Sequence, residues 1–381
     1  MTSSGTSDVV VVGAGAIGAA VAWRCAQRGL SVTAIDPNPE RGAWRTAAGM
    51  LAPITELHYA ESALLTLNLD SLSRYPAFAA EVTDASGLPT GFLECGTVSV
   101  AWDGADLAAL RDLHSFGRRF GLDWQLLSGR ELRTLEPALA AGLPGGLLAA
   151  GDHQVDPRLL HAALIAAAES VGARLVRATA NIDVVGDRVV GVTLEDGTSV
   201  RADTVVLAAG AWSGHVAGLP TYLVPPVRPV KGQTLRLRLP GQPRLKHVVR
   251  GTVKGAPIYL LPRADGQVVV GGTMEEVGFD QNPRAGAVYE LLRDAQSVFP
   301  ELGEAVLEEV STGLRPGSPD NAPLIGPSGL DGLIHATGHF RNGILLTPVT
   351  ADGVVELITT GSLPGVLTPF TPARLIQTVS A

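Results

Sequence analysis

Residues 8–18, DVVVVGAGAIG, decide the fold of this chain. Four consecutive valines before the first glycine are typical of a strand that is buried on both faces of a parallel sheet. The residues after the glycines place apolar side chains at the spacing of one helical face. Residues 31–35, SVTAI, predict a second buried strand, which ends in Asp36. Residues 8–36 therefore predict one strand–helix–strand unit with parallel strands.

The glycines of this unit have the spacing that a dinucleotide requires. Gly13 permits a tight turn, Gly15 lets backbone N–H groups approach a pyrophosphate, and Gly18 permits close packing of helix on strand. Asp36 follows about 20 residues on, where an acid accepts hydrogen bonds from a ribose diol and repels a 2′-phosphate. Because strand, glycines, helix and acid agree, we predict a dinucleotide site rather than a glycine-rich turn without a ligand.

Two later segments indicate which dinucleotide binds. Residues 204–212, TVVLAAGAW, predict a strand that ends in small residues, including Gly210, where a flat cofactor could approach. Residues 338–343, GHFRNG, lead into a helix predicted over residues 343–359, whose N-terminal N–H groups could face an anion. A reduced flavin carries negative charge on its pyrimidine ring, and such a helix end would stabilise that charge.

The composition excludes several classes of protein. The chain has 381 residues, enough for two or three domains, and its 46% hydrophobic and 17% charged residues are typical of a globular protein. Asp and Glu outnumber Lys and Arg, 37 to 29, and no basic run exists, so we expect no nucleic-acid partner. Cys25 and Cys95 are too few for a disulfide framework or a zinc site. With no leader or membrane span evident, we expect a cytoplasmic protein without a metal.

The rest of the chain alternates between parallel-sheet and antiparallel-sheet patterns, which predicts an α/β fold of two interleaved domains. The predicted helices are 62–82, 105–120, 157–172 and 285–299. The predicted strands are 92–101, those starting near 174, 181, 188 and 198, and 204–207, 233–239, 258–262, 267–272 and one near 310. One domain is assigned residues 1–85, 150–220 and 318–381, and the other residues 86–149 and 221–317.

Five segments of the chain resemble the FAD-dependent D-amino-acid oxidase superfamily. They are residues 13–18, AGML at 48–51, VKGQ at 230–233, GLRPG at 313–317 and GHFRNGILL at 338–346. The resemblance runs over nearly the whole chain and is strongest to the glycine-oxidising members of thiamine biosynthesis. It implies a Rossmann-like FAD-binding domain of the glutathione-reductase type, interleaved with an antiparallel-sheet α+β substrate domain. It also implies noncovalent FAD, a small amino-acid substrate, O2 as acceptor with release of H2O2, and a homotetramer.

The resemblance also implies which residues contact the cofactor. They are Gly13, Gly15, Ala16, Ile17, Gly18, Asp36, Pro37, Ala48, Gly49, Met50, Asn181, Gly210, His339, Phe340, Arg341, Asn342, Gly343, Ile344 and Leu345. Residues 43–46, AWRT, depart from the small and hydroxylated residues usual in the family, which leaves the phosphate contacts there open. Asn181 stands where the family usually has an apolar residue that touches adenine through its backbone, a contact that could survive the change.

Arg315 matches the family's carboxylate-binding arginine, and Tyr259 the tyrosine that closes over the carboxylate; both are assigned catalytic and substrate-binding roles. A guanidinium offers two parallel donors to a carboxylate, and this would fix the substrate Cα over the flavin. Arg341, Met274 and Met50 are the further substrate-binding candidates. The alternative is structural: ion pairs for the arginines, and a plain core role for the tyrosine and methionines.

Several rival functions stay open. A sarcosine oxidase is less favoured, because its covalent flavin uses a cysteine late in the chain and none follows Cys95. A D-amino-acid dehydrogenase differs only in where the electrons go, which the residues do not reveal. A noncatalytic dinucleotide-binding sensor would need no carboxylate anchor such as Arg315. Lone histidines such as His58 and His339 are more often structural, so neither is assigned a proton-transfer role.

Overall fold

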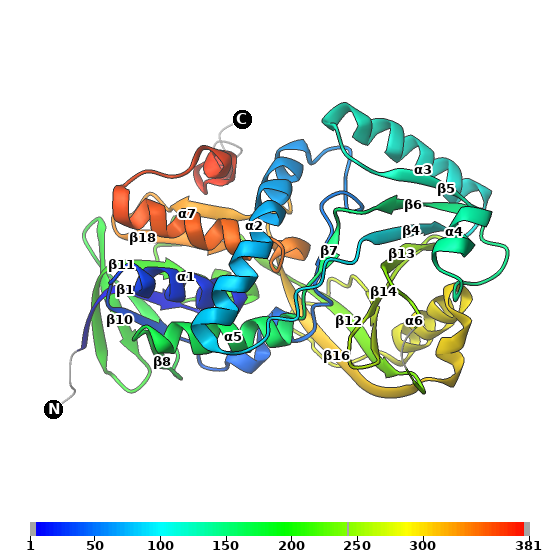
Figure 1. Ribbon diagram of the computed structural model, residues 1–381. Coiled ribbons are helices and arrows are strands. Elements are labelled where there is room, and N and C mark those ends of the chain that lie inside the picture. Colours follow the sequence, from blue (N-terminus) through cyan, green and yellow to red (C-terminus); the bar gives the residue numbers. More distant parts are fainter. Residues whose placement is uncertain (1–4, 242–243, 377–381) are drawn as a thin grey trace.

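The computed structural model describes residues 5–241 and 244–376, whose strands form two large sheets. Figure 1 shows the sheets at opposite ends of the molecule. The first sheet has the order β17 (Leu324–Pro327), β18 (Leu333–Thr337), β11 (Ser199–Leu207), β1 (Gly5–Val12), β2 (Val32–Ile35) and β8 (Arg174–Val176). From β11 it continues into β10 (Arg188–Leu194) and β9 (Ala180–Val185). The strands β2, β1, β11 and β18 run parallel, and for β1 and β2 this confirms the prediction from residues 8–36.

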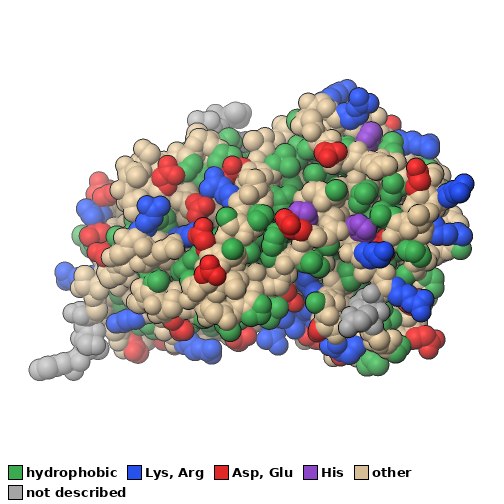
Figure 2. Space-filling model, in the orientation of Figure 1, with side chains coloured by type: hydrophobic (Ala, Val, Ile, Leu, Met, Phe, Trp, Pro, Cys, Tyr) green, Lys and Arg blue, Asp and Glu red, His purple; other side chains and the backbone are tan. Residues whose placement is uncertain are grey.

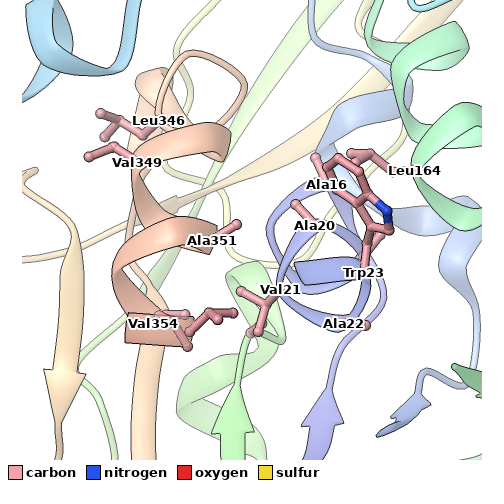
Figure 3. Close-up of a cluster of buried hydrophobic side chains, with 14 of the residues drawn as sticks. Ala16, Ala20, Val21, Ala22, Trp23, Leu164, Leu346, Val349, Ala351 and Val354 are labelled. Atoms are coloured by element: carbon pink, nitrogen blue, oxygen red, sulfur yellow. The ribbon is translucent and has the colours of Figure 1, made fainter. Parts of the chain in front are cut away.

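Four helices pack around the first sheet (Figure 1). They are α1 (Ala16–Gln27), α2 (Ser62–Ser86), α5 (Pro157–Ser170) and α7 (Thr347–Thr360). Figure 3 shows α1 beside α7, with Val21 of α1 facing Val354 of α7. Most buried residues of α1 are alanines, and small side chains let neighbouring helices approach closely. This packing fixes the start of α1, which carries the glycine loop.

The second sheet has the order β16 (Val306–Gly317), β12 (Arg228–Arg238), β15 (Gln267–Gly271), β14 (Ala256–Pro262), β13 (Val248–Val253), β4 (Thr97–Ala101), β6 (Gly145–Ala149) and β5 (Gln125–Ser128). All neighbours are antiparallel except β13 and β4, which are parallel. Helices α3 (Gly104–Gly117), α4 (Gly129–Leu135) and α6 (Ala285–Val298) lie at this end (Figure 1). A small ladder of β3 (Met50–Leu51) and β7 (His153–Gln154) and the short helix α8 (Ala373–Ile376) complete the fold.

The structure corrects three predicted elements. The helix predicted over residues 343–359 begins at Thr347, because Pro348 lacks an N–H and favours the first turn of a helix. The strand predicted over residues 92–101 begins at Thr97, after Gly96 with φ of 72°. The strand from residue 198 and the strand 204–207 are one, β11. The helices α2, α5 and α6 and the β9–β10–β11 meander follow the sequence prediction.

The two sheets draw on separate, alternating parts of the chain. Residues 5–35, 174–207 and 324–337 supply the first sheet, and residues 97–149, 228–271 and 306–317 supply the second. The α/β fold with two sheets is confirmed, whereas the exact domain limits stay a prediction. On the face shown in Figure 2, acidic and basic side chains are interspersed without a continuous basic stripe. In the described part of the chain, no helix is long and apolar enough to cross a bilayer.

Candidate active site

A cavity of about 1110 Å³ is lined by residues of both sheets. This volume lies above the roughly 300–1,000 Å³ of most ligand pockets, so the cavity has room for a large cofactor and a small substrate. It runs past the carboxyl ends of β1, β2 and β11, where open α/β sheets bind ligands. Predicted site residues that line it are Gly13, Gly15, Ala16, Ile17, Asp36, Pro37, Ala48, Gly49, Met50, Asn181, Gly210, Tyr259, Met274, Arg315, His339, Phe340, Arg341, Gly343 and Ile344.

The glycine loop after β1 is tightly built. The N–H of Gly13 donates to the Ile35 carbonyl at 2.8 Å, and a Cβ at Gly13 would lie 2.4 Å from the Ala208 carbonyl oxygen. Gly18 does not line the cavity; a Cβ there would lie 1.9 Å from the Gly13 carbonyl oxygen, so its absence lets α1 pack on the loop. The loop therefore brings the start of α1 to the cavity, where helix N–H groups can bind a pyrophosphate.

Asp36 is held by the glycine loop and by its own turn. One carboxylate oxygen accepts the Ala14 N–H at 2.8 Å, and the other accepts the Asn38 N–H at 2.8 Å. Each oxygen keeps a lone pair free, and the residue lines the cavity. The carboxylate is thus oriented for a ribose diol.

Trp44 explains the departure at residues 43–46. Its indole stacks on His161 of α5, with ring centroids 3.9 Å apart and planes at 8°, and its Nε1 donates to the Pro39 carbonyl. His161 Nε2 lies 2.8 Å from the Ala14 carbonyl oxygen, so Nε2 must be the donor. Burial lowers the pKa of His161, opposed by that hydrogen bond, which favours a neutral ring. The pair supports the glycine loop, and the unusual tryptophan was its only trace in the sequence.

The segment before α7 presents free backbone donors. Within residues 5–241 and 244–376, no backbone hydrogen bond uses the N–H of Gly343, Ile344 or Leu345. Gly343 and Ile344 line the cavity, so their N–H groups are available to an anion there, although the helix starts later than predicted. Asn342 and Leu345 do not line the cavity. The Asn342 N–H donates to the His339 carbonyl, and the Leu345 carbonyl accepts the Ser71 hydroxyl at 2.6 Å.

His339 lines the cavity at the edge of this segment. It is buried, its Nε2 lies 3.1 Å from the Thr350 hydroxyl, and burial lowers its pKa to about 3. The ring is therefore neutral at physiological pH. That it takes no proton-transfer role stays a prediction.

Arg315 and Tyr259 lie side by side at the second sheet. Arg315 Nη1 donates to the Thr273 carbonyl at 3.0 Å, and among the described residues the guanidinium has no carboxylate partner. Burial raises the pKa of Tyr259; the Arg315 guanidinium opposes that rise and the Glu56 carboxylate adds to it. The Tyr259 ring covers Gly271 and Gly272, where a Cβ would lie 2.3 Å and 2.5 Å from its hydroxyl oxygen. A partly buried guanidinium without a carboxylate partner, beside a tyrosine, has the donors to bind a small anion.

The other substrate-binding candidates differ in exposure and pairing. Arg341 is ion-paired with Glu61, and its guanidinium lies 5.8 Å from the Phe340 ring centroid, so its contacts are those of the structural alternative, an ion pair. Met50 in β3 is partly buried, whereas Met274 is 64% exposed at the cavity edge. Arg341 thus has its charge compensated, in contrast to Arg315.

Sequence reasoning missed one charged pair in the same cavity. Arg250 Nη1 lies 3.5 Å from a carboxylate oxygen of Glu56, and both residues line the cavity. Arg250 stands directly opposite Tyr259 in the β13–β14 ladder. Neither residue belongs to a recognisable motif, and they are far apart in sequence, so no local pattern could have joined them.

The fold, the glycine loop and the free donors before α7 define a dinucleotide-binding oxidoreductase of the flavin type. Residues 8–357 match the family model described as FAD dependent oxidoreductase, so the chain belongs to this family and its cofactor is FAD. The residues present fit that cofactor. The N–H groups at the start of α1 would hold the pyrophosphate, Asp36 the ribose, and the donors at residues 343–344 the pyrimidine ring.

Among members of the family, the chain is similar to glycine oxidases and to ThiO/ThiG proteins. The chain is 34% identical over 375 residues to glycine oxidase of Geobacillus kaustophilus and covers 98% of each chain. The crystal structure of that species' glycine oxidase has a TM-score of 0.89 at 32% identity, covering 97% of this chain and 99% of the other. The chain is also 34% identical to the bifunctional protein ThiO/ThiG of a Synechocystis species, covering 98% of this chain and 55% of that protein. It thus spans about half the length of that relative.

Proposed function

We propose that the protein oxidises glycine, with FAD as cofactor and O2 as electron acceptor, to glyoxylate, ammonia and H2O2. The observation that carries this proposal is the uncompensated guanidinium of Arg315 beside Tyr259 in the FAD cavity. The likeness to glycine oxidases over nearly the full chain supports it. Sarcosine and small D-amino acids are the further substrate candidates, since each presents the same carboxylate and an amine on the adjacent carbon.

The chain's own groups bind and orient the substrate. The Arg315 guanidinium donates two parallel hydrogen bonds to the substrate carboxylate, and the Tyr259 hydroxyl donates a third. This fixes the substrate Cα in one orientation, which replaces a bimolecular encounter by a preset geometry. Bound FAD supplies the hydride acceptor. No side chain is assigned as a base: the substrate reacts with a neutral amine, and the imine is hydrolysed by water.

The decisive experiment uses glycine in air and under nitrogen. Glycine oxidase activity predicts stoichiometric H2O2 in air and bleaching of the flavin absorption when glycine is added anaerobically. Reduction of an artificial dye without peroxide would instead indicate a dehydrogenase. A yellow protein that neither bleaches nor forms peroxide would indicate the noncatalytic sensor, and faster turnover of sarcosine than of glycine would favour the sarcosine oxidase alternative.

The physiological setting is a further part of the proposal. The likeness to ThiO/ThiG proteins supports supply of the glycine imine to thiazole assembly in thiamine biosynthesis. A deletion strain that needs added thiamine or thiazole to grow would support this role, and unchanged growth would oppose it. A cytoplasmic location and a homo-oligomer, a tetramer in the superfamily resemblance, are proposed with it. Cell fractionation and light scattering of the purified holoenzyme test these two points.

A further inference from the structure

Asp152 lies outside the cavity, and its buried carboxylate accepts hydrogen bonds from a segment of the cavity wall. It lies in the turn between β6 and β7 and is 0% exposed. Its carboxylate accepts the Ile54 N–H at 3.0 Å, the Thr55 N–H at 2.8 Å and the Thr55 hydroxyl at 2.7 Å. A buried carboxylate is costly unless such donors satisfy it, so these three bonds hold the two chain segments together.

The gripped segment forms part of the substrate end of the cavity. Residues 52–61 connect β3 to α2 without helix or strand, and the five consecutive residues 55–59 line the cavity; we call them the wall segment. Glu56 of this segment pairs with Arg250, which stands opposite Tyr259 in the sheet. The wall segment is therefore tied to β13, the strand that pairs with the Tyr259 strand, β14.

We propose that Asp152 is a positioning residue for substrate binding: it holds the wall segment at the distance from Tyr259 and Arg315 that a small amino acid requires. The proposal rests on the proposed function, because it assumes that the anion at Arg315 is the substrate. Asp152 itself touches neither the cavity nor the cofactor site. Irregular segments without strand pairing depend on such side-chain contacts for a fixed conformation.

The surroundings of Asp152 make its hydrogen bonds to Ile54 and Thr55 sensitive to pH. Arg250 faces it from β13, Cys95 from the segment before β4, and His153 follows it in the chain. Burial raises the pKa of Asp152 to about 7, opposed by the bonds from Thr55 and Ile54 and by the Arg250 charge. A protonated carboxyl gains a donor and loses part of its acceptor capacity. Below about pH 7 the grip on the two N–H groups and the hydroxyl therefore weakens.

The first test is Asp152→Asn in the full-length holoenzyme, with Asp196→Asn in the exposed β10–β11 turn as the matched control. The asparagine amide group is nearly isosteric, but it presents an N–H donor where an acceptor is needed. We expect the KM for glycine to rise about tenfold or more, with a smaller change in kcat. We also expect the wild type to show an inflection in kcat/KM near pH 7 that the variant lacks, with an unchanged flavin spectrum and FAD dissociation constant. Asp196→Asn should leave all these values as in the wild type.

A second pair of variants keeps the proposal testable if Asp152→Asn does not fold. Thr55→Val removes the hydroxyl bond and keeps both N–H bonds, so we expect a rise of about threefold in KM. Thr55→Ser keeps the hydroxyl and should recover most of that loss. A folded, FAD-loaded Asp152→Asn enzyme with wild-type KM and pH profile would overturn the proposal, even if it were less heat-stable. So would equal KM values for Thr55→Val and Thr55→Ser.

Arg315→Ala, measured alongside, separates this proposal from the function on which it rests. If Arg315→Ala leaves glycine kinetics unchanged, the assignment of the substrate site fails and the positioning proposal fails with it. If Arg315→Ala raises the KM and Asp152→Asn does not, only the positioning proposal fails.

Discussion

The guanidinium of Arg315 rests on Gly232. The two residues lie on paired strands, β16 and β12, two positions apart in the ladder, where Arg315 pairs with Val230 and Gly232 with Gly313. A Cβ at Gly232 would lie 2.3 Å from Nη1 and 2.6 Å from Cζ of Arg315, closer than any real contact. The absence of a side chain at residue 232 thus creates the space in which the guanidinium faces the cavity. The VKGQ segment and the GLRPG segment, which resemble the same superfamily, are here two halves of one structural unit.

Gly232→Ala should therefore impair substrate binding and leave the fold intact. The methyl group meets the far end of a flexible side chain, so Arg315 moves away and the strand pairing survives. We expect the KM for glycine to rise about tenfold or more, with the melting temperature within a few degrees of wild type. Steady-state kinetics and a thermal melt measure this. Gly286→Ala in α6, where a Cβ would meet nothing within 4 Å, is the control. An unchanged KM in Gly232→Ala would contradict the assignment.

Arg315→Lys tests the geometry of the clamp separately from its charge. A lysine ammonium keeps the charge but cannot form two parallel hydrogen bonds with a carboxylate. We expect kcat/KM for glycine to fall about 100-fold, equivalent to about 2.7 kcal/mol of transition-state binding, while the protein stays yellow. Arg341→Lys should have a much smaller effect, because Arg341 is already paired with Glu61. Equal losses in the two variants would show that Arg315 has no special role.

The glycine loop and the sheet around it could be predicted from the sequence because their signals are local. Consecutive valines, spaced glycines and an acid within residues 8–36 specify a strand, a turn, a helix and a strand whatever the rest of the chain does. The N-cap of α5 is equally local: Asp156 accepts the N–H groups of Arg158 and Leu159. Such features need no knowledge of partners elsewhere.

The charged groups around the substrate could not be predicted in the same way. Asp152 bonds to residues 97 and 98 positions away, and Arg250 of β13 meets Glu56 of the irregular segment before α2. His161 reaches the glycine loop across 147 positions. These contacts arise from the crossing of the chain between two sheets, and a single sequence carries no periodicity that reports them. The resemblance to a known family supplied Arg315 and Tyr259, whereas their support comes only from the structure.

Lys231, next to Gly232 in β12, should be important for stability. Its side chain is 0% exposed; Nζ lies 3.1 Å from a Glu275 carboxylate oxygen and donates to the Asn282 carbonyl at 3.1 Å. Removing one partner of a buried ion pair typically costs about 3–5 kcal/mol. We expect the loss of unfolding free energy in Lys231→Met to lie near the lower end of this range, because the Glu275 side chain is 23% exposed and can be hydrated.

Urea unfolding of the holoenzyme measures this loss. The control is Lys246→Met, since Lys246 is exposed and, among the described residues, its side chain makes no hydrogen bond or ion pair, while its backbone N–H donates to Glu136. Its free energy of unfolding should stay within about 0.5 kcal/mol of wild type. A Lys231→Met protein as stable as the Lys246→Met control would show that the buried pair contributes nothing net.

Two buried histidines should make the folded state less stable in mild acid. Burial lowers the pKa of His335 to about 4 and that of His339 to about 3, and neither ring nitrogen of His335 has a hydrogen-bond partner among the described residues. The unfolded chain takes up these protons below about pH 6.5, so each histidine lowers stability as the pH falls, by up to about 1.4 kcal/mol per pH unit.

Asp152 has the opposite effect on stability as the pH falls: it stabilises the folded state. Its pKa in the folded chain is about 7, above the value of about 3.9 in an unfolded chain, so the folded state binds this proton first and gains stability as the pH falls from 7 to 4. His335→Leu should therefore reduce the decline in unfolding free energy between pH 7 and pH 5, and Asp152→Asn should make it steeper. Urea unfolding of the three proteins at both pH values measures the slopes. Identical slopes would mean that these buried groups have the same proton affinity folded and unfolded, which their complete burial argues against.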